Sequence, residues 1–569
     1  MSRSLPAALP TDPQISLDME GMDEESRIVY LREQGAHFLR SSNALLPIAR
    51  IPAEVLGMIF VACAKREWFE HRTDRSRLAI SHVSYRWRSV ALSTPDLWSN
   101  IALHASSKDD KMQECVARAG HCPLTLAIML GRKSAIRDPE RVLSSAEKLI
   151  RRLLQAESLH VNATRADITD LQWPTAPCSS VRRLKFVEPG TTNEEHRVMP
   201  PSAGNFVTAM GMLDTLFPNL QALEAINYTF SFRHWHFPPT LTTLYVDNRD
   251  CLQGSLATEG VLQALQGIPS LENLTLIYDR SPSPQFRPES VQLLHHVSLN
   301  SLQELRLEGL MSTVIPLLAV IEVPSSIRRR ISLNLDDPVY HDQLGPWWGL
   351  LTAHVREIAG DLPSVSLADS RNVKLFSFTV TAWRELRPIG GMGIADYGNL
   401  TADLQYQFVS RQPSVILQSF SSVKDVITAF PFAHVQTLRV RFLNVRFVEM
   451  LDQFAGSRTL ESVGLYGVAG YLMDGLRILA PFDTFQTSPL RTLYVGDISL
   501  ISAFPRLQAI CEGMSKRGAD FKVHITRCFA ITAEQVDELR RHVSTEWDGK
   551  IVEFRRLGRT AEGEGEPLF

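Results

Sequence analysis

The segment Leu241-Thr242-Thr243-Leu244-Tyr245-Val246 has apolar residues at its first, fourth and sixth positions. Leu271-Glu272-Asn273-Leu274-Thr275-Leu276 repeats this arrangement 30 residues later, and Leu302-Gln303-Glu304-Leu305-Arg306-Leu307 repeats it after another 31. Apolar and polar residues that alternate over a few positions predict a strand with one buried face. Because the strand recurs at a nearly constant spacing, the sequence predicts a stack of similar units that share a continuous core.

Further copies of this pattern extend over most of the chain. They begin at residues 220, 435, 460 and 490, and weaker candidates cover 181–186, 331–335 and 373–378. Residues 260–265 and 447–454, between copies, have the apolar spacing of a helix, so each unit is expected to combine a strand with a helix or an irregular connection. Residues 111–128 and 146–161 show the same helix-then-strand order and are expected to start the array. Residues 336–434 do not follow the period, which predicts an insertion or a broken ladder.

The end of the array also has a recognisable pattern. Residues 521–525 are expected to form a strand, and Thr532-Ala533-Glu534-Gln535 has the spacing of a capping box, which predicts a helix from there to about Val543. A terminal helix of this kind would cover the open edge of the last unit.

Upstream of the array, residues 46–98 contain two short amphipathic helical patterns. Apolar residues recur at three- and four-residue steps near Val55 and Ile59, and again near Val83 and Trp87. The charged stretch 65–77 between them is expected to be a loop, and residues 24–40 are expected to form a preceding helix. Because so small a unit buries a poor fraction of its surface, its apolar faces require either the rest of the chain or a partner.

Composition excludes several classes of function. The 569 residues include 59 Lys and Arg against 62 Asp and Glu, so no global charge attracts the chain to nucleic acid or to an anionic membrane. Seven scattered cysteines without a CxxC pair argue against a disulfide framework and against a zinc site. Neither a signal peptide nor a membrane span is predicted, so an intracellular protein of the cytoplasm or nucleus is expected, without cofactor or metal. No nucleophile or acid–base motif is evident, and a non-catalytic binding protein is therefore expected.

Residues 46–98 resemble an F-box. The pattern consists of Ile51-Pro52, Glu54, Val55-Leu56, Ile59-Phe60, Val83, Trp87-Arg88 and Leu97-Trp98, with Leu46-Pro47 before it. Ser84 stands where many F-boxes have cysteine, which is a departure from the family pattern. With the strand repeats downstream, the chain resembles the divergent F-box and leucine-rich-repeat proteins of mushroom-forming fungi. The repeats depart from the regular family pattern, since their ninth position is not the usual asparagine.

The resemblance implies a substrate-recognition subunit of an SCF-type (Skp, cullin, F-box) ubiquitin ligase. In that role the F-box binds a Skp-family adaptor, which connects it to a cullin-RING ligase, and the repeats bind an unidentified protein substrate. The residues expected to contact the adaptor are Leu46, Ile51, Pro52, Val55, Ile59, Val83 and Trp87. Leu56, Phe60, Val90 and Trp98 are expected to pack inward. The alternatives are a non-ligase interaction scaffold and an enzyme with a site among the connections between strands.

The expected fold class is α/β, with an N-terminal helical F-box followed by an irregular leucine-rich-repeat solenoid, or horseshoe. The predicted divisions are a disordered N-terminus at 1–19, a helix at 20–45, the F-box at 46–99, the solenoid at 100–530, and a cap helix and tail at 531–569. Polar residues between the strand leucines are expected to face the concave surface and to bind substrate. They are Lys185, Glu224, Tyr245, Thr275, Arg306, Asn334, Arg439 and Tyr494.

Overall fold

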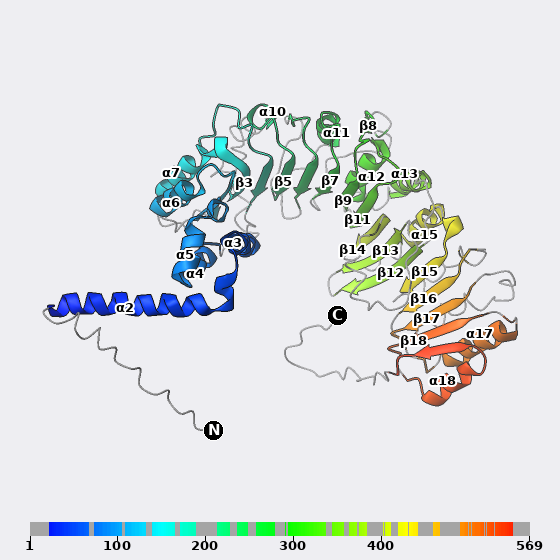
Figure 1. Ribbon diagram of the computed structural model, residues 1–569. Coiled ribbons are helices and arrows are strands. Elements are labelled where there is room, and N and C mark those ends of the chain that lie inside the picture. Colours follow the sequence, from blue (N-terminus) through cyan, green and yellow to red (C-terminus); the bar gives the residue numbers. More distant parts are fainter. Residues whose placement is uncertain are drawn as a thin grey trace, which may run out of the picture. The chain divides into compact units, whose positions relative to one another are not determined.

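The chain forms a mixed α/β structure, shown as a computed structural model in Figure 1. The structure describes residues 22–67, 73–104, 109–131, 139–164, 171–188, 213–227, 236–248, 258–278, 291, 294–336, 344–357, 364–372, 375–383, 402, 404–410, 419–430, 432–441, 454, 459–466, 490–498, 500–501, 503–516, 518, 520–528 and 530–549. The chain divides into two compact units. The first comprises residues 1–129 and 137–159, and the second comprises 130–136 and 160–569.

The first unit is mainly helical. Its helices are α2 (Glu24–Leu45), η1 (Pro47–Arg50), α3 (Ala53–Glu67), α4 (Thr73–His82), α5 (Tyr85–Leu92), η3 (Pro95–Leu97), α6 (Asp109–Ala119), α7 (Pro139–Ile150) and η5 (Leu153–Gln155). Two parallel strands, β1 (Asn100–His104) and β2 (Leu124–Gly131), pair with Ile101 opposite Leu126. The chain passes from the first unit to the second within β3 (Ala156–Ala163).

Both ends of the charged segment 65–77, which was expected to be a loop, are helical, and residues 68–72 lie outside the described residues. Residues 65–67 belong to α3, and Thr73 begins α4, which continues to His82. Arg77 is 2% exposed, so part of this charged stretch is buried in the helical packing. Helix formation here follows from tertiary contacts of α4 with α3 and α5, which override the local polarity.

The second unit is built on one long, mostly parallel arrangement of strands. Its strands are β4 (Arg183–Val187), β5 (Ala222–Ile226), β6 (Thr243–Asp247), β7 (Asn273–Ile277), β9 (Glu304–Leu310), β11 (Arg328–Asn334), β12 (Ser364–Asn372), β13 (Leu375–Trp383), β14 (Leu404–Ser410), β15 (Thr437–Arg441), β16 (Ser462–Tyr466), β17 (Thr492–Gly496), β18 (Lys522–Thr526) and β19 (Ser544–Trp547). We call this set the strand ladder. A separate parallel pair joins β8 (Val297–Ser298) to β10 (Ile321–Glu322).

Helices of the second unit connect the strands and cover one face of the ladder (Figure 1). They are α10 (Leu213–Leu216), α11 (Thr258–Gln266), α12 (Met311–Val320), α13 (Leu344–Arg356), α15 (Phe420–Ala429), η11 (Phe432–His434), α17 (Phe504–Lys516) and α18 (Ala533–Arg540). The helix predicted at 260–265 lies within α11. The helix predicted at 447–454 lies almost entirely outside the described residues.

The leucine pattern predicts the strands with a constant offset. The segments that start at Leu241, Leu271 and Leu302 form strands that begin two residues later, at Thr243, Asn273 and Glu304. The first leucine of each segment lies before the strand and is nevertheless at most 3% exposed, so it belongs to the core. The second and third apolar residues then alternate with polar ones, and this alternation buries one face of each strand.

The ladder changes direction within the segment that does not follow the sequence period. Strands β12, β13 and β14 are antiparallel neighbours, and the spatial order is β11, β14, β13, β12, β15. Both outer members of this meander remain parallel to the adjoining ladder, since Ile331 pairs with Tyr406 and Leu367 pairs with Val440. The meander therefore inserts three strands without interrupting the hydrogen-bonded sheet.

The predicted capping box is present at the end of the ladder. The Thr532 hydroxyl accepts a hydrogen bond from the Gln535 backbone N–H at 3.2 Å, and the Gln535 side chain accepts one from the Thr532 N–H at 3.0 Å. The helix that follows ends at Arg540, three residues earlier than predicted, because residues 544–547 form β19 against β18. No helix among the described residues is long and apolar enough to cross a membrane.

Candidate protein-docking surface

Exposed large apolar side chains are concentrated in one short part of the chain. Of the seventeen found among the described residues, fifteen lie between residues 28 and 92, and the other two are Leu154 and Ile501. Scattered exposed apolar residues are ordinary, whereas a concentration of this kind marks an interaction surface. The first unit therefore contains the strongest candidate for a protein-docking site.

Helix α3 is apolar on both its inner and its outer sides. Leu56 and Phe60 are each 1% exposed and form its packed face. On the outer side, Val55, Met58 and Ile59 are 45%, 71% and 42% exposed. A helix on the surface of a soluble protein normally has a polar outer face, so the outer face of α3 is suited to contact with another protein.

Helix α5 and the turn before it add a second group of exposed apolar side chains. Val83 and Tyr85 are 57% and 66% exposed, while Trp87 is half-buried with its ring 5.0 Å from that of Phe60. The Ser84 hydroxyl caps α5 by accepting a hydrogen bond from the Trp87 N–H at 3.2 Å. Serine thus fulfils a local structural role at the position where the F-box pattern often has cysteine.

The residues predicted to contact an adaptor divide into two classes of exposure. Leu46, Pro52, Val55, Ile59 and Val83 are exposed, whereas Ile51 and Trp87 are half-buried. The Arg86 guanidinium donates a hydrogen bond to the Ile51 carbonyl and so ties the start of α3 to α5. Trp87 supports the fold through Phe60 as well as facing solvent.

The residues predicted to pack inward are all buried. Leu56, Phe60, Val90 and Trp98 are at most 7% exposed. The Trp98 indole N–H donates to the Ala91 carbonyl at 2.8 Å, and the Arg118 guanidinium lies 4.5 Å from the centre of its ring. The buried tryptophan thereby fixes the end of α5 against the segment that follows.

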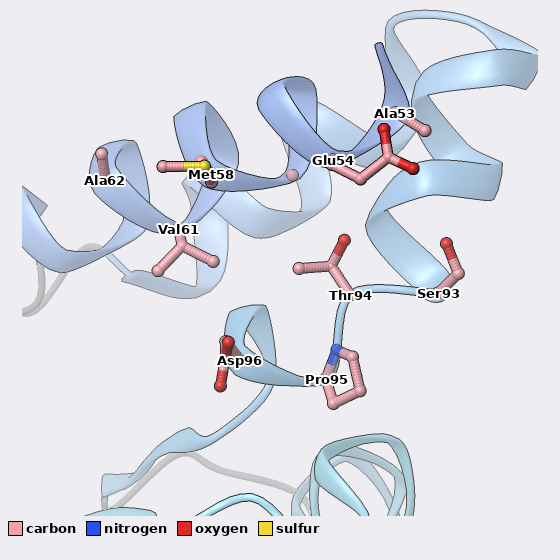
Figure 2. A pocket seen from close by; sticks show the side chains of 10 residues that line it. Ala53, Glu54, Met58, Val61, Ala62, Ser93, Thr94, Pro95 and Asp96 are labelled. Atoms are coloured by element: carbon pink, nitrogen blue, oxygen red, sulfur yellow. The ribbon is translucent and has the colours of Figure 1, made fainter.

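A groove of about 480 Å³ lies between α3 and residues 93–96 (Figure 2). It is lined by Ala53, Glu54, Gly57, Met58, Val61, Ala62, Ser93, Thr94, Pro95 and Asp96. The groove depends on a close approach at Gly57, where an added Cβ would lie 3.0 Å from the Thr94 hydroxyl oxygen. The floor is formed by small and apolar groups, and the carboxylates of Glu54 and Asp96 make it suited to an apolar side chain beside a basic one.

The sequence pattern did not identify several residues of this surface. Met58 is among the most exposed apolar residues, and Leu45, Ile48, Leu78, Tyr85 and Leu92 are also exposed. The available signal was the near absence of charge in residues 53–64, where Glu54 is the single charged residue. A helix without a polar face indicates that more than one face makes contacts.

A second candidate surface is the side of the strand ladder opposite the helices. Five of the residues predicted to bind substrate lie side by side on adjacent strands: Lys185, Glu224, Tyr245, Thr275 and Arg306. Most of the charge in this row is neutralised locally. Lys185 and Glu224 form an ion pair at 2.6 Å, and Arg306 pairs with Glu308 at 2.5 Å.

The other three residues predicted for this surface behave differently. On β11 the residue next to Arg306 is Arg330, so Arg330 continues the row. Asn334 lies opposite Leu310 and is therefore outside the row. Arg439 is in register with the row but is only 5% exposed, because its guanidinium lies over the Trp383 ring at 5.9 Å. Tyr494 is half-exposed and stacks on His524, with ring centres 4.4 Å apart. The pattern missed His524 and Glu546, whose carboxylate oxygen lies 3.0 Å from Nδ1 of His524.

The chain matches no known protein-family model and no curated protein. Its function must therefore be inferred from the surfaces themselves.

The two surfaces differ in their chemistry. No group of three or more His, Cys, Asp or Glu within the described ranges could hold a metal ion. Burial raises the pKa of both Cys511 and Cys528 to about 12, so these thiols are protonated at neutral pH and are not activated nucleophiles. The first unit offers apolar side chains in a compact patch, and the ladder offers paired charges and aromatic rings.

Proposed function

We propose that this protein is a substrate-recognition subunit of an SCF-type ubiquitin ligase. In this proposal residues 46–98 act as an F-box that binds a Skp-family adaptor, and the strand ladder acts as an irregular leucine-rich-repeat array that binds a protein substrate. The protein itself carries out no bond chemistry. It contributes proximity, because it brings the substrate close to the ubiquitin-transfer machinery.

The observation that carries the proposal is the apolar outer face of α3 together with the exposed residues beside α5. Val55 and Ile59 on α3, and Val83 in the turn before α5, are between 42% and 57% exposed, while Leu56 and Phe60 on the inner side of α3 are buried. A rigid helical patch of this kind suits helix-against-helix docking, in which a few central apolar anchors supply most of the binding energy. The F-box resemblance falls on this same patch.

The size of the effect can be estimated from burial. Covering a valine or isoleucine side chain that is now half-exposed contributes on the order of 1 kcal/mol, and replacing it by a charge adds a desolvation cost of several kcal/mol at the interface. Two such replacements in the centre of the patch therefore weaken adaptor binding by at least about 100-fold, which corresponds to about 2.7 kcal/mol.

The ladder supports the second half of the proposal. Its helix-free face carries half-exposed polar and aromatic side chains, including Tyr245 and Tyr494. Aromatic residues among paired charges are typical of protein-binding surfaces, and the local ion pairs leave little net field to attract a polyanion. A protein or peptide is therefore the proposed ligand of this face.

The proposal is tested by recovery of the adaptor with the full-length chain from cell extract. We expect a Skp-family adaptor and a cullin to co-purify with the unmodified protein. The double variant Val55→Asp, Val83→Asp should lose both. These positions are chosen because they are exposed, whereas changing Trp87 would also remove its contact with Phe60.

A matched control uses Leu154 and Ile501, the exposed large apolar residues that lie outside residues 28–92 in the described part of the chain. The variant Leu154→Asp, Ile501→Asp carries the same added charge and should recover the adaptor normally. Circular dichroism of both variants checks that the fold is retained. Equal recovery by all three proteins would refute docking through α3 and α5, and recovery of adaptor without cullin would favour a non-ligase scaffold.

A further inference from the structure

A buried arginine lies on the helix-covered side of the ladder. Arg329 of β11 is 5% exposed and stands in register with Leu305 of β9 and Leu404 of β14. Its neighbours Arg328 and Arg330 point to the opposite, helix-free face, as strand alternation requires. A buried guanidinium cannot lose its charge and is costly unless an anion compensates it.

The described residues provide no carboxylate partner for this arginine. Arg329 takes part in none of the ion pairs found between described residues of the second unit, and its Nε is buried there without a hydrogen-bond partner. By contrast, the nearby arginine of the other face, Arg306, pairs with Glu308 at 2.5 Å. Among the described residues, the half-exposed Arg306 thus has a carboxylate partner and the buried Arg329 has none.

Two further polar side chains interact with Arg329, one of them fully buried and the other half-buried with its Nε2 atom enclosed. Tyr406 of β14 pairs with Ile331, two residues along from Arg329, and is fully buried on the same side of the sheet. His354 lies on α13, which packs against β14 through Trp348 and Phe408, whose rings are 5.7 Å apart. The Tyr406 hydroxyl adjoins the Arg329 guanidinium, whose charge and hydrogen bond act on it, and His354 Nε2 is buried without a hydrogen-bond partner among the described residues.

The protonation of these groups makes them hydrogen-bond donors. Burial, reinforced by the charge of Arg329, lowers the pKa of His354 to about 3, so its imidazole is neutral at physiological pH. Burial raises the pKa of Tyr406, which keeps its hydroxyl proton. A guanidinium and a tyrosine hydroxyl can donate, and a neutral imidazole can donate from Nε2. The cluster therefore combines one positive charge with three donors.

We propose that Arg329, Tyr406 and His354 form an internal binding site for an oxyanion of the phosphate type. An oxyanion supplies the negative charge that would compensate Arg329, together with acceptor oxygens for the buried Nε of Arg329 and the buried Nε2 of His354. A guanidinium binds two oxygens of such a group in a planar, bidentate arrangement, which a monatomic anion cannot reproduce.

The position of the cluster assigns a structural effect to the anion. Arg329 stands on the last parallel strand before the antiparallel meander, and Tyr406 stands on the first strand of that meander in space. An anion held by both would join the two parts of the ladder, and α13 would cover it. Binding is therefore coupled to the stability of the β11–β14 junction.

The test is isothermal titration of the full-length protein with inorganic phosphate, after dialysis into chloride buffer of matched ionic strength. We expect saturable binding at one site. The variant Arg329→Met should weaken it at least tenfold, because methionine fills similar space without a charge. The control variant Arg330→Met, one residue away on the opposite face, should bind phosphate within twofold of the unmodified protein.

A second variant covers the case in which Arg329→Met does not fold. Tyr406→Phe removes only the hydroxyl and should weaken phosphate binding severalfold in a folded protein. Parallel titrations with acetate and glycerol phosphate distinguish a carboxylate from a free or esterified phosphate as the preferred oxyanion. Absence of saturable binding of any of these oxyanions, or equal phosphate binding by Tyr406→Phe and the unmodified protein, would overturn the proposal.

Discussion

Helix α3 and strand β6 are both rich in apolar residues, but they differ in how far these residues are buried. In β6, Leu244 and Val246 are both fully buried by neighbouring strands and helices of the same chain. In α3, Val55 and Ile59 remain more than 40% exposed although Leu56 and Phe60 beside them are buried. Apolar periodicity therefore identifies a helix or a strand. Whether its apolar faces are buried within the chain indicates whether it belongs to the core or to a binding surface. The strands of the ladder bury their apolar residues within the chain. In the proposed function, the outer face of α3 is buried only when the adaptor binds.

The largest effect is expected when one apolar side chain is shortened in each region, which tests the difference in burial directly. Leu244→Ala should destabilise the second unit by about 2–5 kcal/mol, since it leaves a cavity in a closely packed core. Val55→Ala should change stability by no more than about 0.5 kcal/mol, because the side chain has little to lose in the free protein. Urea denaturation followed by circular dichroism measures both. Comparable losses in the two variants would mean that the outer face of α3 is already packed within the chain.

A smaller effect is expected where the ladder is closed by α18. Thr532→Ala removes the hydroxyl that accepts the Gln535 N–H and should cost about 1 kcal/mol. Thr532→Ser keeps the hydroxyl and serves as the matched control. Denaturation midpoints should therefore fall for alanine and stay near the original value for serine. An unchanged midpoint for alanine would show that packing of Val536 and Leu539, both fully buried, holds this helix without its cap.

The smallest effect is expected on the helix-free face of the ladder. Lys185 and Glu224 form their ion pair with side chains that are 30% and 41% exposed, so water and salt screen their attraction. A double-mutant cycle with Lys185→Ala and Glu224→Ala should give a coupling energy below about 1 kcal/mol that decreases as salt is added. A larger, salt-independent coupling would show that this face contributes to the core and is not free for a ligand.

The sequence predicted those parts of the fold in which local pattern and tertiary contacts agree. The leucine segments form strands because each buries its apolar residues against identical neighbours, and the Thr532 capping box forms because both of its hydrogen bonds are local. The inward positions Leu56 and Phe60 were predicted from the F-box resemblance, since spacing defines the faces of a helix but not which face the partner covers.

Other features depend on contacts that no local pattern contains. The start of α4 at Thr73 lies in a charged stretch, and only packing against α3 and α5 explains its helix. Asn334 was predicted to lie in the row of residues beside Arg306, but Arg330 takes that place on β11. The local pattern could not show this, because the register of β11 is fixed by pairing with strands that are distant in sequence. Arg439 has the alternation of an exposed residue but is buried beside Trp383, which comes from the meander.

The reversed order of the meander also has a consequence during synthesis. The partner of Arg329 on its open side is Leu404, 75 residues further along the chain, whereas Thr243 finds Asn273 after only 30. At a translation rate of about 5–20 residues per second, the free edge of β11 leaves the ribosome about 4–15 seconds before its neighbour. An unpaired strand edge can recruit foreign strands. The edge of β11 is therefore open to aggregation for longer than the edges of the regular repeats, such as β6, which pairs with β7 after only 30 residues.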